Sequence, residues 1–284
     1  MAAPLKKDHF PKKRWSQNFL TDANIARKIA QSLDIPSPAL IIEIGPGMGM
    51  LTKHLLSKAS LLYAVEIDPK LAGDLPALLN HPANLQVIEK DFLDIEISEL
   101  HANHTQMNLG VIGNLPYHIT SPILFKVIEN YREITQAVFM VQKEVGQRIA
   151  AEPGNKQFGI LSVFCQFYAE VKYLFTVPTH LFYPRPKVDS GVIRLQFRPE
   201  AEKHLVNPAL FKEIVRKTFG QRRKMLRNTL SNLFPQTILN QISFDLSRRP
   251  ESLAVEEFVD LTNQLNRFLT LEGNGQIASG YRSQ

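Results

Sequence analysis

The chain has 284 residues, of which 44% are hydrophobic and 21% charged, with a formal net charge of +6. This length suffices for one large domain and a smaller one. No apolar run reaches the roughly 18 residues of a transmembrane helix, and the basic start lacks the apolar core of a secretory signal. With a single cysteine, Cys165, the chain cannot form an intrachain disulfide. We therefore expect a cytoplasmic protein without membrane contact.

The positive charge is concentrated in two segments. Residues 1–14 carry a net charge of +4 and residues 211–227 carry +6, which leaves −4 for the remainder. A single basic run is often a solvated helix face, but two of them on a nearly neutral body favour a polyanionic partner. His101 and His104 have no cysteine or carboxylate cluster at ligand spacing, so we interpret them as loop residues and predict no metal site.

The first part of the chain has the pattern of an α/β fold. Thr21 and Asp22 can cap a helix with apolar residues at every fourth position, which Pro36 and Pro38 end. Apolar runs of strand length then alternate with helical patterns. The predicted strands are residues 39–44, 61–67, 85–89, 109–113 and 136–142. Such short, nearly all-apolar strands between helices indicate a parallel sheet with both faces covered.

The pattern changes near residue 171. Residues 171–178 and 188–197 read as two consecutive strands, which predicts an antiparallel pair at the edge of the sheet. Beyond residue 201 the pattern is helical, and Asn207-Pro208 predicts a helix start. We therefore expect a Rossmann-like domain over residues 1–200, which begins with a basic arm (1–20), and a smaller all-helical domain over 201–284 with a loose tail.

The segment IIEIGPGMGML, residues 41–51, reads as a strand, a tight glycine turn and a helix. Gly45, Gly47 and Gly49 would let the backbone approach a ligand without a Cβ in the way. Their spacing departs from the G-x-G-x-x-G dinucleotide fingerprint, because a methionine stands in place of its last glycine. Glu43 lies inside the buried strand, where a carboxylate needs a partner, and we expect it to brace the turn by accepting backbone N–H bonds.

Acidic residues follow the next two strands. Glu66 is placed to accept hydrogen bonds from ribose hydroxyls, and its charge would repel the 2′-phosphate of NADP. Asp91, with Phe92 beside it, could accept from an adenine N6 amine, and Asp94 is the alternative. These residues predict an adenosine along the carboxyl edge of the sheet. The antiparallel final strands and the glycine spacing favour S-adenosylmethionine over a nicotinamide.

The fourth predicted strand ends in GNLPY, residues 113–117. The Asn114 side-chain oxygen and the Leu115 carbonyl could both accept from the exocyclic amine of a nucleobase, which would hold the amine while its lone pair turns toward a methyl group. Pro116 would fix the backbone, and the ring face of Tyr117 would stack on the base. This arrangement predicts methyl transfer to a base amine without a metal or a strong general base.

Several motifs together resemble one family. Asn-Leu-Pro-Tyr is similar to the motif of adenine-N6 methyltransferases. The other shared segments are WSQNFL (15–20), EIGPGMGMLT (43–52), VEID (65–68) and FYPRPKVDSGVIRL (182–195). Over nearly all its length the chain resembles the bacterial ribosomal RNA adenine dimethyltransferases, most closely those of the small subunit. The resemblance implies N6,N6-dimethylation of two adjacent adenines near the 3′ end of 16S rRNA, a role in small-subunit biogenesis, and, we expect, a monomer.

The resemblance also implies roles for single residues. Asn18 and Leu20, in the basic arm, would close over the cofactor. The other implied cofactor contacts are Gly45, Gly47, Glu66, Asp91 and Asn114. Phe182 would sandwich the target adenine opposite Tyr117.

Residues 211–227 are predicted to form one basic helix that docks on RNA. Lys212, Arg216, Arg223 and Arg227 would fall along one face of it. The predicted RNA contacts are Arg222, Arg223 and Lys224.

Three alternatives stay open. The related dimethyltransferases of large-subunit RNA, which confer macrolide resistance, would share the cofactor crevice but use a different docking domain. A DNA adenine methyltransferase is a weaker alternative, because its motif usually begins with Asp or Ser in place of Asn114. The protein could also act mainly as an RNA-binding assembly factor, with methylation secondary.

Overall fold

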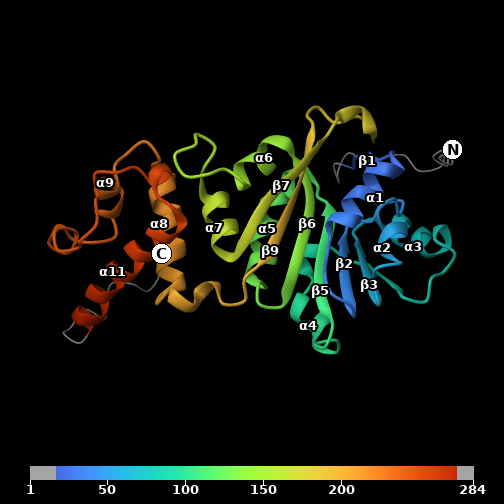
Figure 1. The fold of residues 1–284 in the computed structure, drawn as a ribbon, viewed down its shortest axis with the longest axis horizontal. Coiled ribbons are helices and arrows are strands. Elements are labelled where there is room, and N and C mark those ends of the chain that lie inside the picture. Colours follow the sequence, from blue (N-terminus) through green and yellow to red (C-terminus); the bar gives the residue numbers. More distant parts are fainter. Residues whose placement is uncertain (1–16, 274–284) are drawn as a thin grey trace. The chain divides into compact units, whose positions relative to one another are not determined.

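The computed structural model describes residues 17–273, with side chains up to Leu269. The predictions for the first sixteen residues of the basic arm and for the tail from residue 274 on lie outside this range. The chain divides into two compact units (Figure 1). The first comprises residues up to Ala150 together with Tyr168–Pro199, and the second comprises Ala151–Phe167 together with residues from Glu200 on. Within the described range, the helices are all too short or too polar to cross a membrane.

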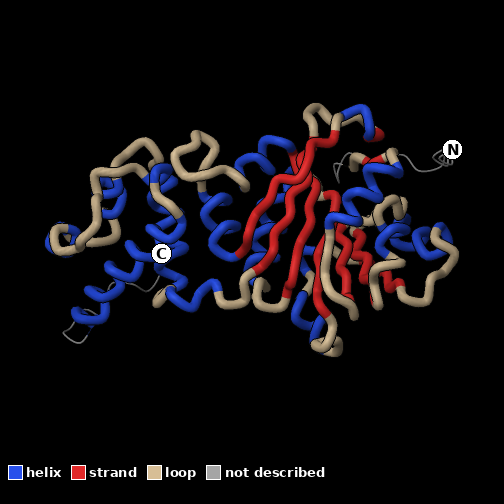
Figure 2. The backbone as a smooth tube through the Cα atoms, in the orientation of Figure 1, coloured by secondary structure: helices blue, strands red, loops and turns tan. Residues whose placement is uncertain are grey.

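A seven-stranded sheet forms the centre of the first unit, in the order β4-β3-β2-β5-β6-β9-β7 (Figure 2). Its strands are β2 (Ala39–Ile44), β3 (Leu61–Glu66), β4 (Leu85–Glu89), β5 (Asn108–Asn114), β6 (Ile134–Gln142), β7 (Ala169–Val177) and β9 (Ser190–Phe197). Neighbours from β4 to β6 pair in parallel, whereas β9 pairs antiparallel with both β6 and β7. The predicted mostly parallel sheet with an antiparallel edge pair is confirmed, and β9 is its reversed strand.

Helices connect these strands. They are α1 (Ala23–Ser32), α2 (Thr52–Leu55), α3 (Pro69–Leu78), α4 (Ile97–Ala102), α5 (Thr120–Glu129) and α6 (Lys143–Ile149), with 3-10 turns at Phe92–Asp94, Tyr117–Ile119 and Thr179–Leu181. The Asp22 carboxylate accepts from the Ile25 N–H at 2.8 Å, which confirms the predicted cap of α1. The helix predicted after the glycine turn is only the single turn α2.

One face of the sheet packs against α1 and α2 in a hydrophobic core, and this packing fixes which side chains at the strand ends share a face. Ile41 of β2, Leu62 of β3 and Ile112 of β5 belong to this core. Side chains alternate between the two faces of a strand, so positions two or four residues further along point to the same face. At the carboxyl ends of these three strands, those positions are Glu43, Glu66 and Asn114. Because side chains alternate along each strand, these three polar side chains lie on the same face of the sheet at the carboxyl ends of β2, β3 and β5.

A second, two-stranded sheet joins distant parts of the first unit. Strand β1 (Phe19–Leu20) pairs antiparallel with β8 (Phe182–Tyr183), with Leu20 opposite Phe182. Both of those side chains are 5% exposed and belong to the core under α1. The end of the basic arm is thus attached to the FYPRP segment.

The second unit is helical. It contains α7 (Ile160–Tyr168, except its last residue), α8 (Pro208–Gly220), α9 (Leu226–Leu230), α10 (Gln236–Leu239) and α11 (Val255–Gly273), with 3-10 turns at Ala201–His204 and Pro250–Ser252. Asn207 caps α8 by accepting from the Leu210 N–H at 3.0 Å, as predicted. Residues 151–167 were expected within the first domain but belong here. Phe158 packs against Phe219 with ring centroids 6.1 Å apart, and Phe167 against Phe211 at 4.6 Å.

The predicted single basic helix over residues 211–227 is wrong. Helix α8 ends at Gly220, residues 221–225 form a turn, and α9 begins at Leu226. Glycine favours a helix end, and the turn allows Leu226 to be buried. Arg223 and Arg227 therefore do not continue the helix face of Lys212 and Arg216.

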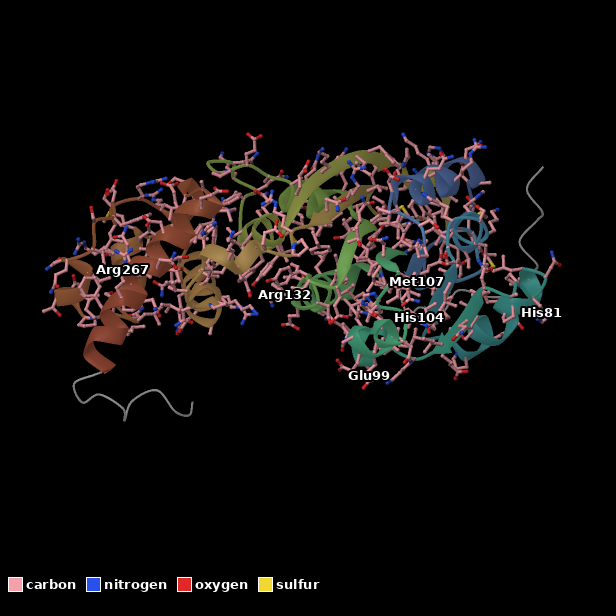
Figure 3. All side chains as sticks on the ribbon, turned by 60° about the horizontal axis from the view of Figure 1, so that its bottom comes forward. His81, Glu99, His104, Met107, Arg132 and Arg267 are labelled. Carbon is pink, nitrogen blue, oxygen red and sulfur yellow. The ribbon has the colours of Figure 1, made fainter. Side chains whose placement is uncertain are left out.

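The two histidines of HANHT are held by other contacts. His101 lies in the last turn of α4, with Nε2 3.1 Å from the Met107 carbonyl oxygen. His104 lies in the following turn, with Nε2 3.4 Å from the Tyr63 hydroxyl (Figure 3). Within the described residues, no group of three or more His, Cys, Asp or Glu side chains is arranged to hold a metal ion.

Candidate active site

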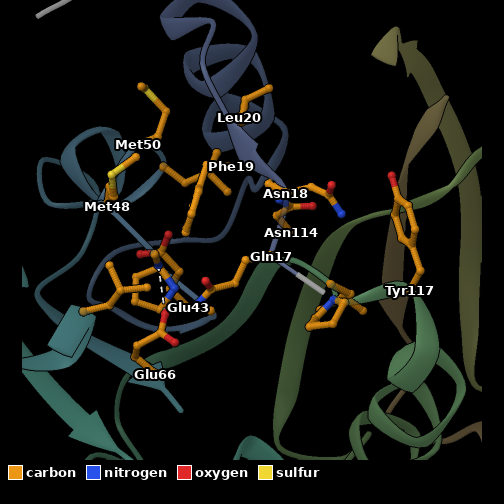
Figure 4. Close-up of a pocket in the computed structure, with 17 residues that line it drawn as sticks. Gln17, Asn18, Phe19, Leu20, Glu43, Met48, Met50, Glu66, Asn114 and Tyr117 are labelled. Carbon is orange, nitrogen blue, oxygen red and sulfur yellow. Dashed lines mark hydrogen bonds between the residues drawn. The ribbon is translucent and has the colours of Figure 1, made fainter. Parts of the chain in front are cut away.

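A pocket lies at the carboxyl ends of β2, β3 and β5, next to β1 (Figure 4). The predicted site residues that line it are Asn18, Leu20, Gly45, Gly47, Glu66, Asn114, Leu115 and Tyr117. Asp91 and Phe182 are not among the lining residues of the described structure. Most of the predicted cofactor and catalytic residues, drawn from separate segments of the chain, are therefore brought together in one place.

The glycine turn after β2 forms one wall of the pocket. Gly45, Gly47 and Gly49 have φ angles of 65°, 56° and 76°, in the left-handed region that side chains disfavour. A Cβ on Gly47 would lie 3.0 Å from the Phe19 ring, whereas a Cβ on Gly45 would meet no atom within 4 Å. The turn thus packs closely against β1 and leaves open space over Gly45, where a ligand can approach the backbone.

Glu66 braces the glycine turn. One carboxylate oxygen accepts from the Gly47 N–H and the other from the Asp68 N–H, both at 3.0 Å. Burial raises the pKa of Glu66, and these backbone hydrogen bonds oppose that shift. Bracing was expected of Glu43, and that prediction is wrong, because it is the acid of the neighbouring strand that faces the N–H groups of the turn.

Glu43 is instead an unpartnered acid in the pocket wall. It is 1% exposed, and within the described residues neither of its carboxyl oxygens makes a hydrogen bond. Burial raises its pKa to about 8, and the charge of Glu66 acts in the same direction. The Thr52 hydroxyl lowers the pKa of Glu43, which opposes this shift, but the hydroxyl and the carboxylate are not placed to form a hydrogen bond. Two buried acids therefore line one pocket, and a positively charged group of a ligand would favour their ionised forms.

Asn114 and Leu115 are held at the end of β5. The Asn114 side-chain NH₂ donates to the Asn18 carbonyl at 2.9 Å, and the two residues are neighbours in Figure 4. The Leu115 N–H donates to the Met140 carbonyl at 3.0 Å, which anchors the turn to β6. The Asn114 side-chain oxygen makes no hydrogen bond to any residue from 17 to 273. It can therefore accept from a group in the pocket.

Tyr117 lines the same pocket. Its hydroxyl lies 2.9 Å from the Ser190 hydroxyl at the start of β9. Burial raises the pKa of Tyr117, so the phenol stays protonated at neutral pH. With its hydroxyl bound to the protein, the residue offers a ring face as its main contact surface.

Two predicted residues lie elsewhere in the first unit. Asp91 accepts from the Leu93 N–H at 2.9 Å and caps the 3-10 turn after β4. Phe182 is buried in the core and does not line the pocket, so its ring has little exposed surface to offer a base there. The side chain next to it, Tyr183, is 51% exposed.

Sequence reasoning missed the apolar wall of the pocket. Its members are Phe19, Met48, Met50, Leu51 and Leu71. The two methionines alternate with glycines in GPGMGM, so their place in the glycine turn was a usable signal that they line the pocket. Leu71 comes from α3, where the pattern gives no such sign.

Known proteins share this architecture. The model of the ribosomal RNA adenine dimethylase family matches residues 9–267. The chain is 42% identical over 265 residues to the ribosomal RNA small subunit methyltransferase A of Bacillus mycoides, a match that covers 89% of this chain and 91% of the relative. The protein of the same name from Bacillus cereus (strain AH187) matches equally well.

Two solved structures are similar. A dimethyladenosine transferase from Plasmodium falciparum superposes with a TM-score of 0.74 at 24% identity and covers 89% of this chain and 98% of its own. The 23S rRNA methyltransferase ErmE superposes with a TM-score of 0.66 at 26% identity, with coverages of 87% and 99%. Family model and relatives agree over most of the length, and the chain belongs to the ribosomal RNA adenine dimethylase family.

Proposed function

We propose that the protein transfers methyl groups from S-adenosylmethionine to the N6 atoms of two adjacent adenines near the 3′ end of 16S rRNA in the small ribosomal subunit. The observation that carries the proposal is the Asn114 side-chain oxygen, which lines the pocket next to Leu115 and accepts no hydrogen bond from any residue between 17 and 273. The names of the 42% identical relatives support the choice of the small subunit. A ribosomal substrate implies a cytoplasmic enzyme.

The pocket fits the proposed cofactor. Gly45 presents backbone next to open space, where a Cβ would otherwise project. Glu66 would accept from the ribose hydroxyls, and the unpartnered oxygens of Glu43 would accept from the ammonium group. When bound, S-adenosylmethionine supplies an electrophilic methyl group on a positively charged sulfur.

The chain's own groups would prepare the target amine. An adenine N6 amine has two N–H donors and a lone pair delocalised into the ring. Asn114 and the Leu115 carbonyl would accept one N–H each, which favours the pyramidal nitrogen that can attack a methyl group. The Tyr117 face would stack on the base and stabilise its developing positive charge. The proton leaves once the nitrogen is cationic, so no strong base is required.

Docking of the RNA is proposed for the second unit. Arg223 and Lys224 are exposed in the turn after α8, and Arg216 and Lys217 are exposed on α8 itself. Arg222 is a weaker candidate than the sequence suggested, because its guanidinium donates to Glu251 at 2.8 Å and to the Asn155 carbonyl at 3.3 Å. Binding of phosphates by the exposed basic side chains would hold the particle while a base leaves its stack.

The test is methyl transfer from labelled S-adenosylmethionine to purified ribosomal substrates. Undermethylated small subunits, naked 16S rRNA, large subunits and naked 23S rRNA would be compared, followed by nucleoside analysis. We expect N6,N6-dimethyladenosine in the small-subunit particle, formed about 10²–10³ times more slowly by the Asn114→Ala variant. Label in 23S rRNA would favour the large-subunit alternative, and binding to particles without transfer would favour an assembly factor.

A further inference from the structure

The direction in which the Asn114 amide points is decided by a backbone carbonyl. A carbonyl oxygen can only accept, so the group 2.9 Å from the Asn18 oxygen must be the NH₂ end of the amide. The oxygen end then lies on the opposite side, free to accept. The reverse orientation would bring two oxygens together at Asn18 and would present N–H donors to an amine that is itself a donor.

The Asn18 carbonyl is held in place by the residues that follow it. Phe19 and Leu20 form β1, paired with β8, and the Leu20 side chain is buried in the core. Thr21 then binds the Leu181 carbonyl twice, through its backbone N–H and through its hydroxyl, each at 2.9 Å. Asp22 begins α1 directly afterwards.

The same hydrogen bonds reach the FYPRP segment. Leu181 immediately precedes β8, and β8 contains Phe182 and Tyr183. Residues 18–21 and 181–183 thus form one short ribbon, with Asn114 bound to its first carbonyl. Within the described residues, the bond to Asn18 is the side-chain hydrogen bond of Asn114 that distinguishes the two orientations of its amide.

We propose that this ribbon is a positioning device for catalysis, and that Thr21 is a positioning residue that acts through Asn114. By fixing the Asn18 carbonyl, the ribbon keeps the Asn114 oxygen directed at the target amine. The catalytic consequence rests on the proposed function, whereas the hydrogen bond itself does not.

The first test observes the amide directly, without cofactor or RNA. In ¹⁵N–¹H spectra, the Asn114 side-chain signals are identified by their absence from Asn114→Ala. We expect one of the two protons to be shifted downfield with a small temperature coefficient, as in a hydrogen bond. Thr21→Val should move that signal toward the position of a free amide, and Thr21→Ser, which keeps the hydroxyl, should restore it.

The second test is kinetic. Loss of one neutral hydrogen bond in Thr21→Val should lower kcat about three- to tenfold. The KM values for S-adenosylmethionine and for the particle should stay unchanged, and Thr21→Ser should recover the rate. Thr218→Val is the matched control, because its hydroxyl also donates to a carbonyl, at 2.8 Å, but lies in the second unit.

A double-mutant cycle separates positioning from a general effect on structure. If Thr21 acts through Asn114, Thr21→Val should cause no further loss of kcat in the Asn114→Ala background. An equal loss in both backgrounds would overturn the proposal, and so would an Asn114 amide signal that Thr21→Val leaves in place. Absence of methyl transfer by the wild-type protein would refute the proposed function instead, while the spectra would still decide whether the ribbon orients the amide.

Discussion

The carboxylate of Glu66 accepts a hydrogen bond from the backbone N–H of Gly47 at 3.0 Å. This interaction ties the end of β3 to the glycine turn that follows β2. One side chain therefore shapes the backbone wall of the pocket and, by our proposal, also binds the ribose of the cofactor.

Replacing Glu66 with Ala should weaken binding of S-adenosylmethionine. Removal of a hydrogen bond to a charged group costs roughly 1.5–3 kcal/mol, which corresponds to about a 10- to 150-fold increase in Kd. Isothermal calorimetry measures the change. Glu89→Ala is the control, because Glu89 ends the adjacent strand, pairs with Glu66 in register and is exposed. Equal affinities of Glu66→Ala and wild type would contradict the assignment.

Asn114→Ala should abolish most methyl transfer while the fold persists. Removal of an acceptor aimed at the reacting nitrogen is expected to lower kcat by about 10²–10³. Single-turnover transfer of labelled methyl groups measures this decrease, and thermal unfolding checks the fold. Asn108→Ala is a matched control, since Asn108 begins the same strand and its side chain likewise donates to a carbonyl, that of Pro36. Turnover of Asn114→Ala near that of the control would remove Asn114 from the mechanism.

Glu43 should make stability depend on pH. Its pKa is about 8 in the folded protein and 4.5 without the fold. Below pH 4.5 the Glu43 carboxyl group is protonated in both the folded and the unfolded protein. Above pH 4.5 it ionises in the unfolded chain but stays protonated in the folded protein. The free energy of unfolding therefore falls as the pH rises toward 8. The slope is at most about 1.4 kcal/mol per pH unit.

The neutral variant Glu43→Gln should remove this contribution. Urea unfolding of Glu43→Gln and wild type from pH 5 to 9 should therefore give stabilities that diverge with rising pH, in favour of the variant. The exposed Glu89→Gln should follow the wild type throughout. Parallel curves for Glu43→Gln and wild type would show that Glu43 titrates normally.

Substitutions in the basic turn after α8 should distinguish residues that bind RNA from a residue that is paired within the protein. Replacing Arg223 and Lys224 with Ala should weaken binding to small subunits and reduce the slope of log K against log salt by about 0.7–0.9 for each phosphate that is no longer neutralised. Arg222→Ala is the matched comparison. Because Arg222 is paired with Glu251, its replacement should lower the melting temperature and leave the salt slope almost unchanged. A wild-type slope in the Arg223, Lys224 double variant would place the docking surface elsewhere.

The sheet and most of the pocket were predictable because they depend on local patterns. Buried parallel strands are nearly all apolar, so a polar residue at the end of one, such as Asn114, stands out. The alternation of side chains then places it on the same face as Glu66, two strands away in the sheet.

The errors concern interactions between residues far apart in sequence. The periodicity of 211–227 allows one long helix, and only the burial of Leu226 and the pairing of Arg222 show that the chain turns. The sequence of residues 151–167 does not show to which unit they belong. Only the structure shows it, because Phe158 and Phe167 pack against aromatic rings of α8. In the same way, nothing in FYPRP shows that Phe182 pairs with Leu20 of β1 and is buried in the core.

The reversal of β9 determines which segment of the chain can reach the pocket. In a fully parallel sheet, the final strand would present its last residue, Phe197, at the edge where β5 and β6 end. Because β9 runs the other way, its first residue, Ser190, pairs with Gln142 at that edge and binds the Tyr117 hydroxyl. If Tyr117 stacks on the target base as we propose, the segment before the strand, rather than the one after it, would lie on the side of that base. On this proposal, variation in residues 182–189 would alter the choice of substrate without any change in the strands that line the proposed cofactor pocket.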